Sequence, residues 1–342
     1  MRAAVLRNKQ LVVDNVPAPA PGPGQVLVET LACGICGSDL HMVQHLDALL
    51  QNAASIGAPF PFEVDRDLVM GHEFSARVLE LGAGVSEVQP GDVVTSLPIV
   101  VTGDGPRAVG YSVDYPGGYG ERMVLMSALC RKAPDGVDPR HVALTEPMSV
   151  GFHAVVKSGV APGDAAIVLG CGPIGLACIA ALRADGIEPI IAADFSPTRR
   201  ALATRMGALE VVDPREQPAI EAWQRVDGAK PLVIFEAVGV PGMIAQAMRD
   251  APAAARIMVV GACMEADTIW PMLGINKELT IQFSLGSRPD EFDRTLQLIA
   301  SGELDVEPLI TGEIGITGVP GAFEELRNPD AHAKILVQPA LG

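Results

Sequence analysis

The sequence predicts an α/β protein with a compact β-rich domain and a second domain built on a doubly wound parallel sheet. The chain has 342 residues, enough for two domains of ordinary size. Short strand-like segments fill the first 150 residues, and from residue 151 buried-strand patterns alternate with helical ones. Hydrophobic residues make up 49% and charged residues 19% of the chain, which is typical of a packed globular protein.

The first 150 residues carry brief runs rich in β-branched residues, bounded by Gly and Pro, including a turn-rich connector at 17–24. The expected strands are AAVL (3–6), LVVD (11–14), GQVLVET (24–30), SARVLELG (75–82), GDVVTSLP (91–98) and RMVLM (122–126). Short strands at this density predict a barrel-like β domain.

The middle of the chain repeats a buried strand followed by a helix. The expected strands are AAIVLG (165–170), PIIAAD (189–194), EVVD (210–213), LVIFEAVG (232–239) and ARIMVVGA (255–262). Helical patterns at 174–186 and 198–208 fall between them, which predicts a parallel sheet with helices on both faces. From about residue 287 the sequence shows a mixture of strand and helix patterns. We therefore expect one domain from 1–150 with 287–342, and another from 151–286.

Charge and cysteine usage exclude several classes of protein. The net charge is 25 − 41 = −16, which repels nucleic acid and acidic membrane surfaces. The apolar stretch at 165–182 is interrupted by GCGPIG and is better explained by a strand followed by a helix than by a membrane span. The start lacks a signal-peptide pattern, and six scattered cysteines are typical of reduced thiols. We expect a soluble cytoplasmic protein.

The glycine pattern GCGPIG, with Gly170, Gly172 and Gly175, predicts a dinucleotide site. GxGxxG alone is a weak signal, but here it follows a strand and opens a helix. The first glycine permits the tight turn, the second lets the backbone approach a pyrophosphate, and the third lets helix and strand pack closely. Pro173 and Ile174 begin the helix, whose N-terminal N–H groups would face the phosphates.

Asp194 ends the next strand, nineteen residues after Gly175. A carboxylate there can bind the adenosine ribose and would repel a 2′-phosphate, which favours NAD over NADP. The alternative is a surface Asp that caps the following turn. Arg199, five residues further on, either accommodates a phosphate or belongs to an ordinary solvated helix start, and we favour the second interpretation.

The segment CGICGSDLH (33–41) is the candidate for metal chemistry. A structural zinc needs a second close pair of ligands, and the chain has no other CxxC. A redox CxxC usually begins a helix after a strand, whereas this one falls in a β-rich region. A catalytic zinc needs three protein ligands from distant parts of the chain. The candidates are Cys36, His72, Glu73 and Glu146, each of which could also be structural.

The sequence resembles the medium-chain, zinc-dependent alcohol and polyol dehydrogenases along nearly its whole length. The matching motifs, in order, are GICGSDLH, GHEF, EPMSVGFHA, VLGCGPIGL with Asp194, FEAVG, AFEEL and KILVQP. The resemblance implies a GroES-like catalytic domain, a Rossmann domain, and a catalytic zinc held by Cys36 and His72. It implies that Glu146 lies beside the metal, directly or through water, and that Glu73 binds it or stands just behind. Cys33 matches no ligand position and is expected to pack.

Two departures from the family bear on the site. The segment at 91–121, where many members carry four cysteines for a structural zinc, has no cysteine, so we expect one zinc per chain. The segment at 42–70 is longer than the family pattern suggests. Within it, LDALLQ (46–51) is expected to form a short helix at the mouth of the pocket, and His45 is expected to be an exposed loop residue.

The resemblance also implies a proton path. Ser38 would take the alcohol proton, His41 would pass it on through the cofactor ribose, and Asp39 would fix the imidazole of His72. We therefore expect an NAD-dependent zinc enzyme that interconverts a secondary alcohol or polyol and its ketone. The alternatives are a zinc-free, NADPH-dependent quinone or enoyl reductase and a non-catalytic nucleotide-binding relative. A dimer or a tetramer is expected.

Overall fold

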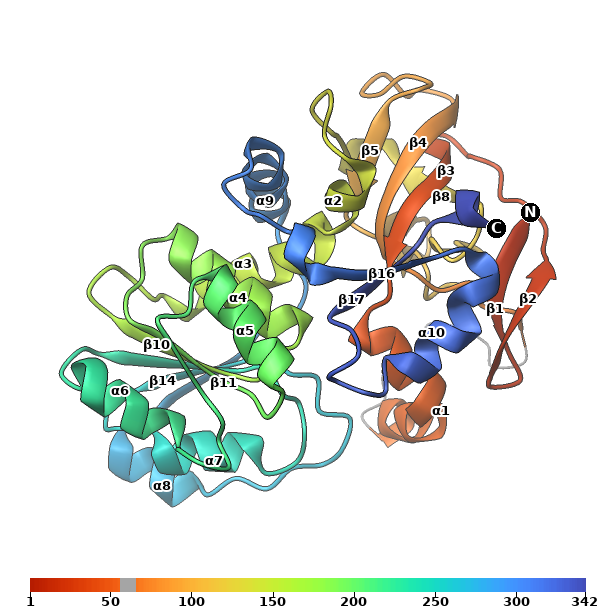
Figure 1. Cartoon of the computed structure of the whole chain (residues 1–342). Coiled ribbons are helices and arrows are strands. Elements are labelled where there is room, and N and C mark those ends of the chain that lie inside the picture. Colours follow the sequence, from red (N-terminus) through yellow and green to blue (C-terminus); the bar gives the residue numbers. More distant parts are fainter. Residues whose placement is uncertain (56–65) are drawn as a thin grey trace. The chain divides into compact units, whose positions relative to one another are not determined.

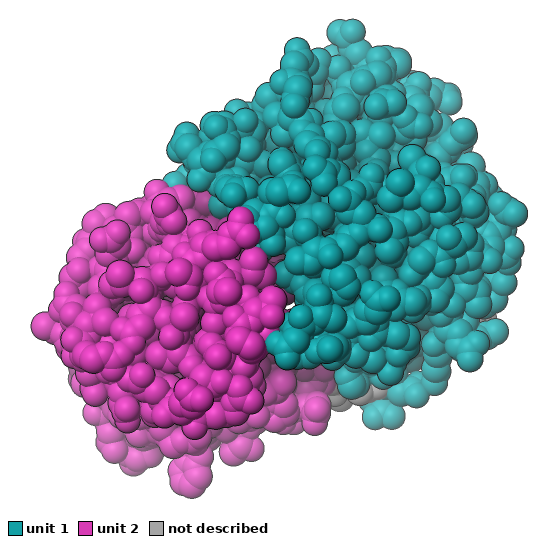
Figure 2. All heavy atoms as spheres, in the orientation of Figure 1, with its two compact units in different colours: residues 1–146, 292–342 teal, residues 147–291 magenta. Residues whose placement is uncertain are grey.

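The computed structural model describes residues 1–55 and 66–342, which divide into two compact units (Figure 2). Unit 1 comprises Met1–Glu146 and Phe292–Gly342, and unit 2 comprises Pro147–Glu291. Unit 1 is thus assembled from both ends of the chain, whereas unit 2 is continuous.

Two helices run across the unit boundaries. Helix α3 (Thr145–Ser158) begins at the end of unit 1, and α9 (Pro289–Ser301) begins at the end of unit 2. The expected changes after residues 150 and 286 therefore differ by a few residues from the boundaries in the structure, because a helix continues through each of them.

Unit 1 is built mainly from antiparallel strands. Its principal sheet has the order β16-β17-β3-β4-β5-β9, with β8 also paired to β3, and two hairpins, β1–β2 and β6–β7, stand beside it. Its strands are β1 (Arg2–Arg7), β2 (Gln10–Asn15), β3 (Gln25–Gly34), β4 (Glu73–Leu81), β5 (Val93–Ser96), β6 (Ile99–Thr102), β7 (Gly105–Ala108), β8 (Arg122–Met126), β9 (Cys130–Lys132), β16 (Ile310–Ile314) and β17 (Lys334–Val337). Its other helices are α1 (Gly37–Ser55), α2 (Pro139–Ala143) and α10 (Val319–Glu325).

The pairing of β17 with β3 joins the two ends of the chain. Figure 1 shows this blue C-terminal strand beside the red N-terminal one, and Leu336 and Val337 align antiparallel with Gly34 and Cys33. Strand β3 also pairs with β4, so that the ends of β3 and β17 and the start of β4 lie together. This corner of the sheet carries the candidate site.

Unit 2 contains a six-stranded, wholly parallel sheet with the order β12-β11-β10-β13-β14-β15. Its strands are β10 (Ala165–Leu169), β11 (Ile190–Ala193), β12 (Glu210–Val212), β13 (Leu232–Glu236), β14 (Arg256–Val259) and β15 (Thr280–Phe283). Its helices are α4 (Pro173–Ala184), α5 (Pro197–Met206), α6 (Ala219–Asp227), α7 (Met243–Asp250) and α8 (Pro271–Lys277). Figure 1 shows α4 and α5 on one face and α6 and α7 on the other.

The strand order of unit 2 confirms the doubly wound fold that the sequence predicted. Every residue of β11 and β13 is buried, as expected for parallel strands covered by helices on both faces. In the described part of the chain, no helix combines the length and the apolar character that crossing a membrane would require.

Candidate active site

The motif CGICGSDLH spans the junction between β3 and α1. Cys33 lies inside β3, and Cys36 lies between Gly34 at the strand end and Gly37 at the helix start. The expectation that this CxxC is not at a strand–helix junction is therefore wrong. Cys33 is nevertheless fully buried, and burial raises the pKa of its thiol well above the usual range. Its packing role is confirmed, and Cys36 is the only partly exposed thiol of the pair.

His72 reaches the same corner from the segment that leads into β4. Gly71 before it has a φ of +101°, and a Cβ there would lie 2.8 Å from the Tyr119 ring and 2.9 Å from Cys33 Sγ. Only glycine fits this turn. The donor atoms of Cys36, His72 and Glu73 lie within 4.8 Å of one another. Thiol, imidazole and carboxylate thus converge on one place.

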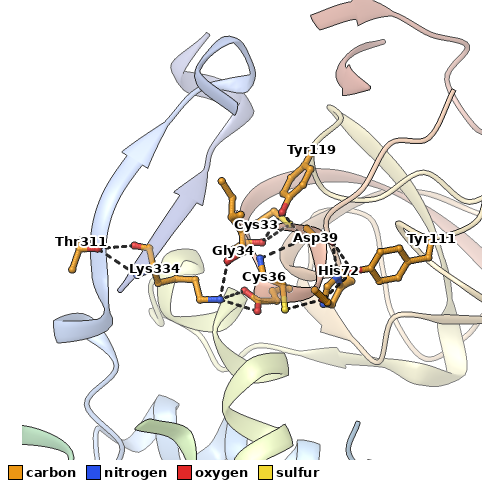
Figure 3. Close-up of polar contacts among 12 residues, drawn as sticks. Cys33, Gly34, Cys36, Asp39, His72, Tyr111, Tyr119, Thr311 and Lys334 are labelled. Atoms are coloured by element: carbon orange, nitrogen blue, oxygen red, sulfur yellow. Dashed lines mark hydrogen bonds and ion pairs between the residues drawn. The ribbon is translucent and has the colours of Figure 1, made fainter. Parts of the chain in front are cut away.

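Glu73 is held by a buried lysine (Figure 3). Lys334 Nζ lies 2.8 and 2.7 Å from the two carboxylate oxygens of Glu73 and donates a third hydrogen bond to the Ile35 carbonyl at 3.0 Å. The two side chains are only 3% and 1% exposed. Burial lowers the pKa of Lys334, but the charges around it, chiefly that of Glu73, outweigh this and raise it. Lys334 therefore stays charged beside the donor cluster.

Glu146 lies in the first turn of α3, outside the group of three donor atoms. Burial raises the pKa of its carboxyl to about 7, and the positive charge of His72 opposes this shift. Glu73, Lys334 and Asp39 also act on it electrostatically, so Glu146 belongs to the same charged cluster.

Asp39 lies at the centre of a buried hydrogen-bond network (Figure 3). Its Oδ1 accepts from the Tyr111 hydroxyl at 2.7 Å, and its Oδ2 accepts from the Tyr119 hydroxyl at 2.6 Å and from the Cys36 N–H at 3.3 Å. Oδ1 also lies 3.5 Å from His72 Nδ1. Burial raises the pKa of Asp39, but the charge of His72 and these hydrogen bonds outweigh it, and the net shift is downward.

Neither the two tyrosines nor Lys334 stands in a motif that the sequence marks as functional. A signal for the tyrosines was present, because all three tyrosines of the chain fall between residues 111 and 119, in the segment that lacks the structural-zinc cysteines. Lys334 stands at the start of the predicted strand KILVQP, where a lysine resembles an ordinary strand end.

Ser38 and His41 lie one turn apart on α1, a spacing that puts both on one face of the helix. Ser38 Oγ donates to Cys36 Sγ at 3.1 Å and lies 2.8 Å from the Tyr111 hydroxyl. Burial, and then the nearby His45, lower the pKa of His41. The rings of these two histidines have centroids 5.8 Å apart.

The helix expected at 46–51 is confirmed, because α1 runs from Gly37 to Ser55. His45 is exposed as predicted, but it lies at a kink inside α1 (φ −124°, ψ 25°), so its placement in a loop was wrong. The motif's glycine and serine begin a long helix that the sequence did not indicate. The part of the 42–70 segment from 56 to 65 lies outside the described residues.

In unit 2 the glycine motif forms the turn from β10 into α4. Gly170 has a φ of +89°, and a Cβ at Gly175 would lie 1.8 Å from the Gly170 carbonyl oxygen. Pro173 is the first residue of α4, followed by Ile174, and Gly172 caps the helix. A Cβ at Gly172 would meet nothing closer than Arg199 Nη1 at 3.9 Å. The space in front of Gly172 is open, as close approach of a ligand requires.

Asp194 follows β11 beside this turn. Its Oδ2 accepts from the Cys171 N–H and its Oδ1 from the Ser196 N–H, both at 2.8 Å. Each oxygen keeps a further lone pair for a ligand hydroxyl. The Arg199 N–H is capped by Ser196 Oγ, while its Nε is buried without a hydrogen-bond partner among the described residues.

Two protein-family models match the chain, one in each half. Residues 22–135 match the family described as "Alcohol dehydrogenase GroES-like domain", and residues 173–301 match "Zinc-binding dehydrogenase". The first match contains Cys36, His72 and Glu73, and the second begins at Pro173 of the glycine turn.

Relatives that match along nearly the whole chain are also dehydrogenases. The (R,R)-butanediol dehydrogenase of Bacillus subtilis is 33% identical over 99% of this chain and 100% of its own length. Sorbitol dehydrogenase of Bos taurus is 30% identical over 95% of this chain and 94% of its own. A crystal structure of a putative zinc-binding dehydrogenase from Sinorhizobium meliloti 1021 bound to NADP has a TM-score of 0.85 at 29% identity, covering 99% of both chains.

Proposed function

Because the chain belongs to the family of zinc-type, medium-chain alcohol and polyol dehydrogenases, we propose that it interconverts a secondary alcohol or polyol and the ketone by hydride transfer. The observation that carries this proposal is the convergence of Cys36, His72 and Glu73 within 4.8 Å. Thiolate, imidazole and carboxylate are all ligands that Zn²⁺ accepts. A zinc-free quinone or enoyl reductase, or a non-catalytic relative, would have no use for them.

Cys36 and His72 would hold the metal together with a carboxylate. Glu73 is the carboxylate within reach, and Glu146 is a further candidate, directly or through water. A zinc ion bound there supplies Lewis-acid chemistry that lowers the pKa of an alcohol hydroxyl. Asp39, close to His72 Nδ1, favours the tautomer that leaves Nε2 free as a ligand.

Ser38 and His41 would carry the alcohol proton away. The Ser38 hydroxyl lies against the thiol of Cys36, so it is next to any alcohol oxygen bound at the donor cluster. It would accept the alcohol proton as it gives up its own. His41 is on the same face of α1, and its lowered pKa leaves its imidazole neutral and able to accept near pH 7.

The glycine turn of unit 2 would bind a nicotinamide dinucleotide, and we propose NAD. The turn formed by Gly170, Gly172 and Gly175 would let the pyrophosphate approach the N-terminus of α4, where Pro173 and Ile174 begin the helix. Asp194 would accept hydrogen bonds from the adenosine ribose and disfavour a 2′-phosphate. Arg199 borders the same turn, and the Sinorhizobium relative binds NADP, so both cofactors belong in the test.

The test combines metal analysis with a substrate panel. Purified protein should contain about one zinc per chain and reduce NAD when given secondary alcohols and diols, with NADP a poorer acceptor. Cys36→Ser and His72→Ala should each lose zinc and turnover while still binding NAD. His45→Ala, at an exposed histidine of α1, should keep its zinc. Near-normal activity in either ligand variant would contradict the metal assignment.

We also propose a cytoplasmic homo-oligomer, a dimer or a tetramer. Each of the six cysteines, all in the described part of the chain, is a free thiol, as in a reducing compartment. Large apolar side chains between residues 269 and 285 of unit 2 are exposed, which is typical of a surface that another chain covers.

A further inference from the structure

Tyr111 contacts three residues of the proposed site, but the mechanism above gives it no role. Its hydroxyl lies 2.8 Å from Ser38 Oγ and 2.7 Å from Asp39 Oδ1. Its ring centroid is 5.2 Å from that of His72. The residue lies between β7 and β8, 73 residues from Ser38 in the chain, and its side chain is partly buried.

The protons available in this network restrict the orientation of Ser38. A phenol has one proton, and an ionised carboxylate can only accept. The Tyr111 hydroxyl donates to Asp39 Oδ1 at 2.7 Å, the shorter of its two contacts, and a hydrogen bond to a carboxylate is the stronger kind. The Ser38 proton then points to the Tyr111 oxygen or to Cys36 Sγ at 3.1 Å. In both arrangements the lone pairs of Ser38 remain free to accept.

We propose that Tyr111 is a positioning residue for alcohol oxidation, which holds the Ser38 hydroxyl in the orientation that accepts the substrate proton. The inference rests on the proposed function. Tyr111 transfers no proton itself. It links Ser38 to the carboxylate that also orients His72, so the proton acceptor and the metal ligand share one rigid support.

Tyr119 provides a matched control. Its hydroxyl donates to the other oxygen of the same carboxylate, at 2.6 Å, and otherwise lies near the Gly34 carbonyl at 3.5 Å. Tyr111→Phe and Tyr119→Phe each remove one hydrogen bond from Asp39. Only the first also removes the hydroxyl that contacts Ser38.

The first measurement is steady-state kinetics of the zinc-loaded enzyme on its best alcohol, in H₂O and D₂O. Tyr111→Phe should lower kcat about tenfold to a hundredfold and increase the solvent isotope effect, with KM and zinc content nearly unchanged. In the Ser38→Ala background the same substitution should cost nothing more, because Tyr111 acts through Ser38. Tyr119→Phe removes a hydrogen bond from Asp39 but no contact with Ser38, so it should lower kcat less than Tyr111→Phe does.

Three results would overturn the proposal. Unchanged kcat in Tyr111→Phe would show that Ser38 needs no such support. Losses that multiply with those of Ser38→Ala would show that the two residues act independently. An equal loss of kcat in Tyr119→Phe would assign the effect to Asp39 in general.

A second measurement does not depend on activity. Urea unfolding midpoints of the parent chain, Ser38→Ala, Tyr111→Phe and the double variant form a cycle for the contact between the two hydroxyls. The midpoint shifts should be non-additive, and strictly additive shifts would overturn the contact. If the parent oxidises no alcohol at all, the proposed function fails, and this cycle still decides whether Tyr111 supports Ser38.

Discussion

At the scale of single residues, the pair formed by Lys334 and Glu73 buries two charges in unit 1, which is a costly arrangement. Removing two charges from water is unfavourable, and their attraction offsets this only when the geometry is good and the remaining protons are bonded. Here both carboxylate oxygens of Glu73 accept hydrogen bonds from Lys334 Nζ, and the Ile35 carbonyl accepts a third. The pair holds β17 to the start of β4, next to the donor cluster.

Lys334→Met should therefore destabilise the protein strongly, by about 3–5 kcal/mol, because it removes the cation that contacts both oxygens of the buried Glu73 carboxylate. Lys9→Met is the matched control. Lys9 pairs with Asp47 at 2.7 Å, but these side chains are 55% and 68% exposed, so the loss should be about 0–1 kcal/mol. Urea unfolding followed by circular dichroism measures both, and equal small losses would contradict the argument.

The same residues show what the sequence can and cannot predict. Cys36, His72 and Glu73 stand in short motifs with recognisable chemistry, so they could be named in advance. The role of Lys334 depends on its ion pair with Glu73, 261 positions away in the chain. Only the pairing of β17, β3 and β4 brings the two residues together. No local pattern contains that information.

At the scale of elements, the turn from β10 to α4 contains two glycines with different roles. Gly175 is needed for packing, and Gly172 is needed for the approach of a ligand. Gly175→Ala places a Cβ 1.8 Å from the Gly170 carbonyl, so α4 must shift away from β10. We expect a loss of about 1–3 kcal/mol. Gly172→Ala meets no close atom and should keep its stability, but its methyl group would block the approach of a pyrophosphate and weaken NAD binding.

Tryptophan fluorescence can follow this comparison, because Trp223 and Trp270, the two tryptophans of the chain, both lie in unit 2. Urea unfolding should show a lower stability for Gly175→Ala than for the parent. NAD titration should show weaker binding by Gly172→Ala than by the parent. A Gly172→Ala variant that binds NAD as tightly as the parent would place the cofactor elsewhere.

Two elements that the sequence did not predict were missed for different physical reasons. Strand β15 has the sequence TIQF and lies at the edge of the parallel sheet, where three of its four residues are exposed and no apolar run or clean alternation forms. Helix α1 begins at Gly37 and Ser38, inside a motif whose chemistry suggested a loop. The central strands were predictable because burial on both faces demands continuous apolar residues.

At the scale of the whole molecule, the edge strand β15 belongs to a stretch of chain, residues 270–285, that carries several large exposed apolar side chains. The exposed fractions are 66% for Trp270, 65% for Met272, 67% for Ile275, 63% for Phe283 and 92% for Leu285. A sheet edge with free backbone groups and exposed apolar side chains favours pairing with another chain. Two copies related by a twofold axis would present the same surface to each other, and the backbone groups of their two β15 edges could then hydrogen-bond to each other.

The net charge of −16 opposes such association, so burial of the apolar side chains must supply the favourable free energy. Light scattering behind size exclusion at micromolar protein should find at least twice the chain mass for the parent. Leu285→Glu combined with Ile275→Glu should give the monomer, because burying two added carboxylates is too costly. Val101→Glu, at a 59% exposed valine of β6 in unit 1, should leave the mass unchanged. A monomeric parent, or a double variant that still associates, would rule out this edge as the interface.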